Sequence, residues 1–456
     1  MYKILIQKFG GTSVEDARAM ERVIEIIRTS GITRRTRPLV VLSACAGVTN
    51  ALIRTSELSL KDDMHDALIS IDQLEARHAR IARDLLKRAA ALERVLADLH
   101  SIWEELRTLV RGVNLLGELT PRSRDQFQSV GERASTLIVH AALSEKLKSV
   151  PVRMYDAREF FLTNGEFTAA RPIALEIRRR MKKIGRELSD GAIGITQGFI
   201  GSTIKNEVTT IGRGGSDFSA AIQGVAVDAS EIQIWTDVAG ILTCDPRIAP
   251  AARTIERISF SDASELAFFG AKVLHPETIW PAVEKGIPVR VLSSKEPDRE
   301  GTIILDSVDS DAPITGIAIK RNVIIARITS RSALPDARVL QAVSDALAEQ
   351  NAVPLAVSLS VDSAVYVLDN PEVISRLRSM VGLIAKIEVE ADRALITLVG
   401  PGLKSHSGIA ARIFRALGRT NCEMISYGGS ETAASFVVEE AVANRIVKRL
   451  HREFFH

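Results

Sequence analysis

The sequence reads Ile4-Leu5-Ile6-Gln7-Lys8-Phe9-Gly10-Gly11-Thr12-Ser13 close to its start, an apolar run that ends in a lysine and a glycine turn. This order is typical of a buried strand that carries a phosphate site at its end. Glycines let the backbone approach anionic oxygens closely, and the N-terminus of a following helix adds partial positive charge. We therefore expect Lys8 to bind phosphate, and Thr12 and Ser13 to cap a helix that begins near Val14.

The spacing of this turn differs from Gly-x-x-x-x-Gly-Lys-Ser/Thr, so it is not a P-loop. The alternative interpretation is a tight turn followed by a helix cap, and these residues alone favour neither. A second segment, Thr210-Ile211-Gly212-Arg213-Gly214-Gly215-Ser216-Asp217, again precedes a helical pattern. Ser216 or Asp217 could cap that helix, but an arginine among three glycines favours ligand binding. We expect both turns to face one ligand.

The composition is that of an ordinary globular protein. A chain of 456 residues with 46% hydrophobic residues can form two or three domains with ample cores. The net charge of +3, from 59 basic and 56 acidic residues, gives no field that would favour nucleic acid or a membrane surface as a partner.

The three cysteines are Cys45, Cys244 and Cys422, and their spacing matches neither a metal site nor a disulfide framework. This usage is typical of a reducing compartment. The chain shows no cleavable leader and no apolar run long enough to span a bilayer. We therefore expect a cytoplasmic protein.

Strand patterns alternate with helical patterns over most of the chain. Residues 4–7 and 39–42 are apolar runs typical of strands buried on both faces, and residues 14–28 between them are helical in pattern. This alternation predicts an α/β fold with an open, mainly parallel sheet. From residue 62 to 119 the apolar spacing is only helical, which predicts a helical insertion that covers the substrate site.

Beyond a polar turn at 295–301, the sequence repeats itself. The run Ile325–Thr329 matches Leu395–Val399, and a helical pattern follows each run at the same offset. A strand, a loop, an amphipathic helix and two strands in each copy predict two small α+β modules. These modules either bind an effector or serve only dimerisation, and the sequence leaves both open.

Three further motifs follow in order: Trp235-Thr236-Asp237-Val238, Thr243-Cys244-Asp245-Pro246-Arg247 and Gly270-Ala271-Lys272-Val273-Leu274-His275-Pro276. Together with the two glycine turns, these motifs resemble those of the aspartate kinases of the amino acid kinase family. The resemblance extends over nearly the whole length of those proteins. The pattern, including Ser129-Val130-Gly131-Glu132, is most similar to the monofunctional, lysine-sensitive type. The resemblance implies the amino acid kinase fold, an open and mainly parallel sheet sandwiched by helices, followed by two ACT modules.

The resemblance also implies a domain organisation. Residues 1–294 would form the catalytic domain, with the helical insertion at about 62–125. Residues 295–320 would form a linker and the first strand of the regulatory region. The two ACT modules would then follow, at 321–392 and 393–456.

The implied reaction transfers the γ-phosphoryl group of ATP to the side-chain carboxylate of L-aspartate, giving 4-phospho-L-aspartate and ADP. This is the first step of lysine, threonine and methionine biosynthesis. Lys8 would stabilise charge on the phosphoryl oxygens, and Asp217 would hold the active-site cations, with Mg²⁺ bridging the phosphates. A carboxylate acceptor is already ionised at neutral pH, so no general base is needed. We predict no separate set of metal-binding side chains.

Ligand-binding residues carry over motif by motif. Glu132 would pair with the substrate ammonium and Arg213 with its α-carboxylate. The predicted substrate-binding residues are Thr49, Glu132, Arg213, Gly214 and Ser216. The predicted ATP-binding residues are Lys8, Gly10, Gly11, Thr12, Ser13, Thr236, Asp237, Leu242, Arg247 and Lys272. Leu242 departs from the aromatic residue that many relatives carry, so aliphatic packing would replace stacking on adenine.

The first ACT module departs most from the lysine-sensitive pattern. Leu355 stands where an acidic partner for an effector ammonium is expected, and Arg338 adds a cation that would repel a lysine side chain. We therefore expect an amino acid effector at the ACT modules but an altered response to lysine. We also expect a homodimer or a higher assembly. The alternatives are another amino acid kinase with a different carboxylate substrate, and an inactive amino acid sensor.

Overall fold

The computed structural model describes residues 1–60, 63–212, 214–270, 276–309, 312–331 and 337–455. The chain divides into two compact units. Unit 1 comprises Met1–Gly240 and Leu274–Asp306, and unit 2 comprises Ile241–Val273 and Ser307–His456. Among the described residues, no helix combines the length and the apolar character that a membrane span requires.

The centre of unit 1 is an open, mainly parallel sheet, as the sequence predicted. Its strands are β1 (Lys3–Phe9), β2 (Thr36–Leu42), β3 (Val152–Tyr155), β4 (Ile193–Gln197), β7 (Glu231–Thr236), β9 (Val289–Ser293) and β10 (Thr302–Leu305). They follow the order β3-β4-β2-β1-β7-β9-β10, and the pairs are parallel except for antiparallel β9 and β10. Six of the seven residues of β1 are buried, as expected of a strand covered on both faces.

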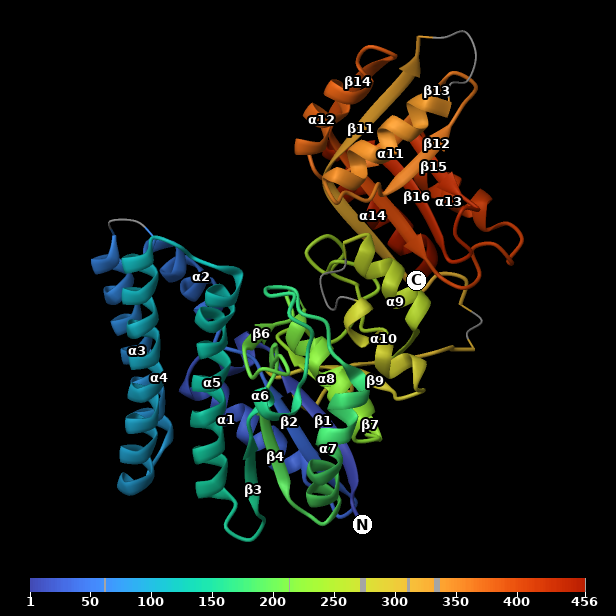
Figure 1. The fold of residues 1–456 in the computed structure, drawn as a ribbon. Coiled ribbons are helices and arrows are strands. Elements are labelled where there is room, and N and C mark those ends of the chain that lie inside the picture. The colour runs from blue at the N-terminus through green and yellow to red at the C-terminus, as the bar shows by residue number, and fades with distance from the viewer. Residues whose placement is uncertain (61–62, 213, 271–275, 310–311, 332–336, 456) are drawn as a thin grey trace. The chain divides into compact units, whose positions relative to one another are not determined.

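Helices cover both faces of this sheet (Figure 1). Val40 and Leu42 of β2 pack in one cluster with residues of α1, α3, α4 and α5, whereas Leu39, on the other face, lies with Leu188 of α7 against Gly194. Helix α8 packs closely on the second face, because a Cβ added to its Gly224 would lie 2.6 Å from Ile232 Cδ1 of β7. The helices of unit 1 are α1 (Ala17–Ile26), α2 (Val48–Leu58), α3 (Met64–Leu85), α4 (Ala89–Leu116), α5 (Pro121–Lys146), α6 (Ala157–Phe160), α7 (Ala174–Ser189), α8 (Gly215–Ala226) and α10 (Pro276–Glu284).

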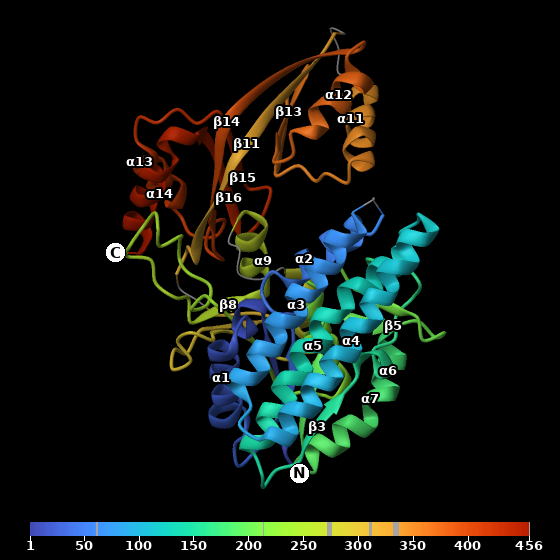
Figure 2. The same cartoon turned by 90° about the vertical axis from the view of Figure 1, so that its left-hand side faces the viewer.

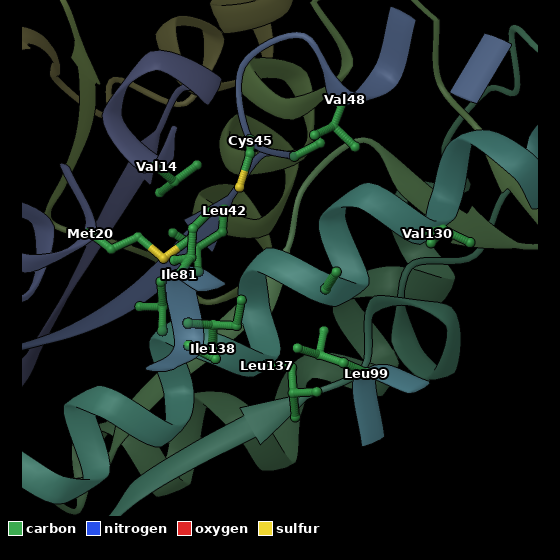
Figure 3. Packing of buried hydrophobic residues seen from close by; sticks show 14 of the residues in the cluster. Val14, Met20, Leu42, Cys45, Val48, Ile81, Leu99, Val130, Leu137 and Ile138 are labelled. Carbon is green, nitrogen blue, oxygen red and sulfur yellow. The ribbon is translucent and has the colours of Figure 1, made fainter. Parts of the chain in front are cut away.

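The predicted helical insertion contains α3 and α4, which lie beside α5 (Figure 2). Apolar residues of these helices and of β2 form one hydrophobic cluster, in which Leu42, Ile81 and Ile138 lie together (Figure 3). Trp103 of α4 is fully buried in this cluster. The insertion is therefore joined to the sheet through a common core.

The first helix begins later than the sequence predicted. A 3₁₀ turn, Gly11–Val14, follows β1, and α1 begins at Ala17 after the cap residue Asp16, whose carboxylate accepts a hydrogen bond of 2.8 Å from Ala19 N. The expected cap by Thr12 and Ser13 is therefore wrong. An aspartate is a strong cap residue, and its position after the turn decides where the α-helix starts.

Unit 2 contains a sheet with the strand order β12-β13-β11-β14-β16-β15. Each repeat follows the predicted strand, helix, strand and strand, and each then adds a helix that the sequence analysis did not foresee. The first repeat is β11 (Gly316–Ser330), α11 (Ala337–Glu349), β12 (Ala356–Leu359), β13 (Ser363–Leu368) and α12 (Glu372–Val381). The second repeat is β14 (Ala385–Val399), α13 (Ile409–Leu417), β15 (Met424–Tyr427), β16 (Ala433–Glu439) and α14 (Glu440–Phe455).

The two repeats exchange halves of their long first strands. β11 and β14 pair antiparallel along nearly their whole length, with register shifts between Lys320 and Ile325. The first half of β11 contributes Ile317 to the core of the second repeat, and the first half of β14 contributes Ala385 to the core of the first. Each core therefore includes a strand segment from the other repeat.

The segment Ile241–Gly270 belongs to unit 2 and contains β8 (Arg257–Ser259) and α9 (Phe260–Phe268). Thr243 Oγ1 lies 3.0 Å from His451 Nε2 of α14, and Thr243 O accepts a hydrogen bond of 2.8 Å from Ile317 N. Cys244 and Ile248 join the core of the second repeat. This segment is thus bound to the ACT region by both polar and apolar contacts.

Candidate functional site

The candidate site lies at the carboxyl edge of the unit 1 sheet. β1, β2, β4 and β7 run parallel, so the loops that follow them meet at one edge. Ligands of open α/β sheets bind at this edge. The turn after Lys8, the loop that leads to Thr49 and the end of β7 at Thr236 all lie there.

An ion pair joins the two glycine turns. Lys8 Nζ lies 2.6 Å from Asp217 Oδ1, and the two side chains are only 10% and 18% exposed. Lys8 is at the end of a central strand, whereas Asp217 is in the first turn of α8, far away in the sequence. The two turns therefore meet, as the sequence analysis expected.

The N-terminus of α8 carries no side-chain cap. Its cap residue is Gly214, with a φ of 70°, and Gly212 is also left-handed at 84°. Ser216 and Asp217 lie within the helix rather than before it, so the alternative in which one of them caps α8 is wrong. The uncapped helix end adds partial positive charge beside Lys8. Arg213 lies outside the described residues.

The turn after β1 packs against the loop after β2, backbone to backbone. Ala46 N donates a hydrogen bond of 3.0 Å to Gly11 O, and a Cβ added to Gly11 would lie 2.9 Å from Ala44 O. Only glycine fits there. Gly10 has ordinary space around it, and its N–H donates to Trp235 O of β7 at 3.1 Å.

The hydroxyl of Ser13 is directed into the protein. It lies 2.8 Å from Ser294 Oγ, which in turn donates to Thr236 O at 3.0 Å. Ser294 N donates to the same carbonyl at 2.8 Å. These bonds fix the end of β7, where the side chains of its last residue, Thr236, and of Asp237 contact each other, with 3.2 Å between Oγ1 and Oδ1.

Glu132 is a buried acid on α5, only 3% exposed. Burial raises the pKa of its carboxyl to about 8, although hydrogen bonds from the backbone of Ala44 and of Glu132 itself lower it. Its Oε2 has no hydrogen-bond partner in the described part of the chain. α5 approaches the loop after β2 closely, because a Cβ added to Gly131 would lie 2.6 Å from Ala44 Cβ. Glu132 is thus available to a cationic group at the site.

Thr49 lies in the first turn of α2, which follows the left-handed cap residue Gly47 with a φ of 80°. The loop after β2, which leads to Thr49, is held from two sides. Ser135 Oγ of α5 donates to Ser43 O at 2.8 Å, and Arg77 of α3 donates to Ala46 O at 3.0 Å.

Arg77 is a site residue that the sequence analysis missed. Its guanidinium also donates to Glu15 O at 2.9 Å, so one side chain connects the helical insertion with the loops after β1 and β2. Nothing in the helical pattern of α3 distinguishes this arginine from its neighbours. The role of Arg77 can be recognised only in the folded structure, where the three segments lie together.

The remaining predicted nucleotide residues belong to the segment Ile241–Val273. Leu242 is half-buried and forms a bridge with Thr254. The Arg247 side chain is 88% exposed and pairs with Asp245 at 2.7 Å. This pairing raises the pKa of Arg247 above its usual range. Lys272 lies outside the described residues.

The arrangement fits a phosphate-binding site better than a metal site formed by protein side chains alone. Within the described ranges, no group of three or more His, Cys, Asp and Glu side chains is close enough to hold a metal ion. Mg²⁺ in nucleotide sites is usually held by one or two carboxylates together with phosphates and waters. Asp217, a partly exposed carboxylate beside Lys8, fits that donor set.

Comparisons with known proteins give the family of the chain. The amino acid kinase family matches residues 3–293, and the ACT domain matches residues 396–454. The lysine-sensitive aspartokinase 3 of Escherichia coli (strain K12) is 35% identical, with 100% of both chains covered. Aspartokinase 1 of Arabidopsis thaliana, a chloroplastic protein, is 36% identical over 99% of this chain and 80% of its own.

Solved structures agree over the full length. Escherichia coli aspartokinase III in complex with aspartate and ADP has a TM-score of 0.80 at 33% identity, with 100% of both chains covered. The same enzyme in complex with lysine and aspartate has a TM-score of 0.85 at 34% identity, covering 99% of this chain and 100% of that one. The chain therefore belongs to the aspartokinases of the amino acid kinase family.

Proposed function

We propose that this aspartokinase transfers the γ-phosphoryl group of ATP to the side-chain carboxylate of L-aspartate, giving 4-phospho-L-aspartate and ADP. The observation that carries the proposal is the Lys8–Asp217 ion pair, which joins the two glycine turns at the edge of the sheet. Phosphoryl transfer depends on positioning and charge neutralisation, and a lysine beside a helix N-terminus supplies both. The product would enter lysine, threonine and methionine biosynthesis.

Lys8 would neutralise charge on the transferred phosphoryl oxygens. Asp217 would hold Mg²⁺ that bridges the phosphates and offsets their negative charge. The ion pair between the two then marks the position of the phosphate tail. On binding, Lys8 would exchange the carboxylate of Asp217 for a negatively charged phosphate, and Asp217 would exchange the ammonium of Lys8 for Mg²⁺. No side chain needs to remove a proton, since the acceptor carboxylate is already ionised.

Glu132 would bind the ammonium of aspartate. Its burial beside the loop after β2 and the unpartnered Oε2 support this role. Arg213 would bind the α-carboxylate, and Gly214, Ser216 and Thr49 would complete the substrate site.

The nucleotide would lie along the ends of β1 and β7. The proposed contacts in unit 1 are Lys8, Gly10, Gly11, Thr12, Ser13, Thr236 and Asp237. The inward hydroxyl of Ser13 supports a contact through its backbone rather than its side chain. Residues 1–294 would supply the catalytic groups and the ACT modules would follow, but the predicted module boundaries after residues 320 and 392 fall within β11 (Gly316–Ser330) and β14 (Ala385–Val399). A cytoplasmic location is supported by the three cysteines, all of which are free thiols.

The first ACT module offers a site for an amino acid effector. A cavity of about 230 Å³ lies between the end of β11, the start of α11 and the β12–β13 turn, and its lining includes Ser330, Val339, Ser360 and Asp362. Leu355 is buried and Arg338 lies on the exposed side of α11. Neither residue lines the cavity, so Asp362 is the carboxylate of its lining that could pair with an effector ammonium.

The sheet of unit 2 supports a homodimer. β12 is at one end of the strand order and exposes Val357 and Leu359, at 43% and 62%, while Val361 in the following turn is 73% exposed. Exposed apolar side chains on a terminal strand favour contact with a second copy. We propose that the second copy of this chain covers it.

Lys8→Met should lower kcat by about 10²–10³-fold while leaving the fold intact, because the charge acts on the ligand rather than in a core. Lys205→Met, at an exposed lysine, is the matched control. A hydroxamate assay with ATP, Mg²⁺ and aspartate, glutamate or N-acetylglutamate measures turnover and substrate choice together. Lys8→Met turnover above a tenth of the wild-type value would contradict the role of Lys8, and preference for another acceptor would contradict the substrate.

Affinity for aspartate should rise with pH up to about pH 8, because free Glu132 is largely protonated below its pKa of about 8 and ammonium binding requires the ionised form. The raised pKa also means that the ligand-free fold loses stability as pH rises between the ordinary glutamate value of 4.5 and about 8. Glu132→Gln should raise KM for aspartate and flatten both profiles, whereas Glu93→Gln, on the exposed side of α4, should change neither. Steady-state kinetics and thermal melts across this range measure the effect. An unchanged KM profile in Glu132→Gln would rule out the ammonium role.

Inhibition by lysine should be weak, and a Ser360→Trp variant that fills the ACT cavity should abolish the response to whichever amino acid inhibits the wild type. The reason is that the cavity is small and that its lining offers one carboxylate, Asp362, whereas lysine carries two ammonium groups. Ser379→Trp, at an exposed position on α12, is the control. Activity is measured against lysine, threonine and methionine. Strong inhibition at sub-millimolar lysine contradicts the altered response, and an unchanged response in Ser360→Trp contradicts the site.

Val357→Lys combined with Leu359→Lys should convert the dimer to a monomer, because like charges would face each other across the paired edge. Leu175→Lys, at an apolar and 84% exposed position on α7, should leave the assembly unchanged. Light scattering after gel filtration gives the mass. A monomeric wild type, or a double variant that stays dimeric, is incompatible with the proposed edge.

A further inference from the structure

Asp125 is a buried carboxylate on α5 that takes no part in the chemistry proposed above. It is fully buried. Both of its oxygens lie 3.0 Å from Thr168 N, Oδ2 also accepts from Thr210 N at 3.0 Å, and Oδ1 accepts from Thr210 Oγ1 at 2.6 Å. Two backbone N–H groups and one hydroxyl thus converge on a single side chain.

The donors belong to the segments that lead into the second glycine turn. Thr210 is the last residue of β6 (Val208–Thr210), which pairs with β5 (Ile200–Ser202), and left-handed Gly212 follows it closely. The carbonyl of Thr210 accepts a hydrogen bond of 2.9 Å from Ala170 N. A Cβ added to Gly212 would lie 3.3 Å from Thr168 O. The loop at 168–170 and the start of the glycine turn are therefore one hydrogen-bonded assembly.

Thr168 has a φ of 72°, which is unusual for a β-branched residue. Such a conformation persists only where the surroundings hold it. The carboxylate of Asp125 accepts the N–H of this residue with both oxygens and donates nothing, so it suits a site that presents only donors. Burial raises the pKa of Asp125, whereas the hydrogen bonds from Thr210 and Thr168 lower it.

The same helix carries Glu132, two turns further along α5 and on the same side. One end of this face is thus fixed to the turn that contains Gly214 and leads to Ser216, and the other end presents the carboxylate proposed to bind ammonium. The distance between these two parts of the substrate site depends on how firmly α5 is joined to the turn.

We propose that Asp125 is a positioning residue for L-aspartate: by holding Thr168 and Thr210, it fixes the substrate-binding turn at Gly214 relative to Glu132. The inference rests on the proposed function, because it assumes that both groups contact aspartate. It adds a residue that lies outside the glycine and carboxylate motifs and that touches no substrate.

The test compares Asp125→Ala with Asp262→Ala in the full-length enzyme. Asp262 is the matched control, since it is a buried aspartate in unit 2 whose carboxylate accepts from Thr315 Oγ1 at 2.8 Å. Asp125→Ala should raise KM for aspartate by about tenfold or more and change KM for ATP by less than about twofold. Asp125→Asn should recover only part of the loss, because its oxygen still accepts from the backbone N–H groups while its amide nitrogen cannot accept from Thr210 Oγ1 or Thr168 N.

If Asp125→Ala fails to fold, the pair Thr210→Val and Thr210→Ser decides, since only the valine removes the hydroxyl donor. Thr210→Val should raise KM for aspartate and Thr210→Ser should not. Equal effects of Asp125→Ala and Asp262→Ala on KM for aspartate, or wild-type KM in Thr210→Val, would overturn the proposal. A wild-type enzyme that does not phosphorylate aspartate at all would instead overturn the function on which the proposal rests.

Discussion

The contact between Lys8 and Asp217 is the constraint on which the site depends. An ammonium at the end of a central strand, with a side chain only 10% exposed, requires a nearby negative charge, because an unpaired buried charge is costly. Its partner comes from the first turn of a helix that begins without a side-chain cap. The end of β1 and the first turn of α8 are therefore joined by one electrostatic contact.

The glycines meet a steric requirement of the same site. Gly11 allows one loop to approach the carbonyl of Ala44, and Gly131 allows α5 to approach the same residue from another side. The loop after β2 is consequently enclosed, and the carboxylate of Glu132 becomes buried beside it. Close packing and the raised pKa of Glu132 are two results of one arrangement, since the backbone approach that excludes water also disfavours the charged form.

The sequence predicted the parallel sheet, the helical insertion and the meeting of the two glycine turns, because apolar runs and glycine-rich motifs are local signals. It was wrong about the first helix cap, since Asp16 competes with Thr12 and Ser13 for that position. It did not reveal Arg77 or Asp125. Their partners lie far away in the chain, and a half-buried arginine or a buried aspartate on a helix cannot be told from a solvated one before the neighbouring segments are assembled. The repeat could be recognised in the sequence. Which of the two cores each half of β11 and β14 would join could not be predicted.

The exchange of strand halves in unit 2 means that the repeats have no independent boundary. β14 runs through residues 392 and 393 without a break, and its first half completes the core of the preceding repeat. Neither repeat could be excised, duplicated or replaced by recombination without leaving its neighbour with an open core. The two repeats therefore have to be inherited together. Local unfolding that begins in one repeat extends along a continuous strand into the other.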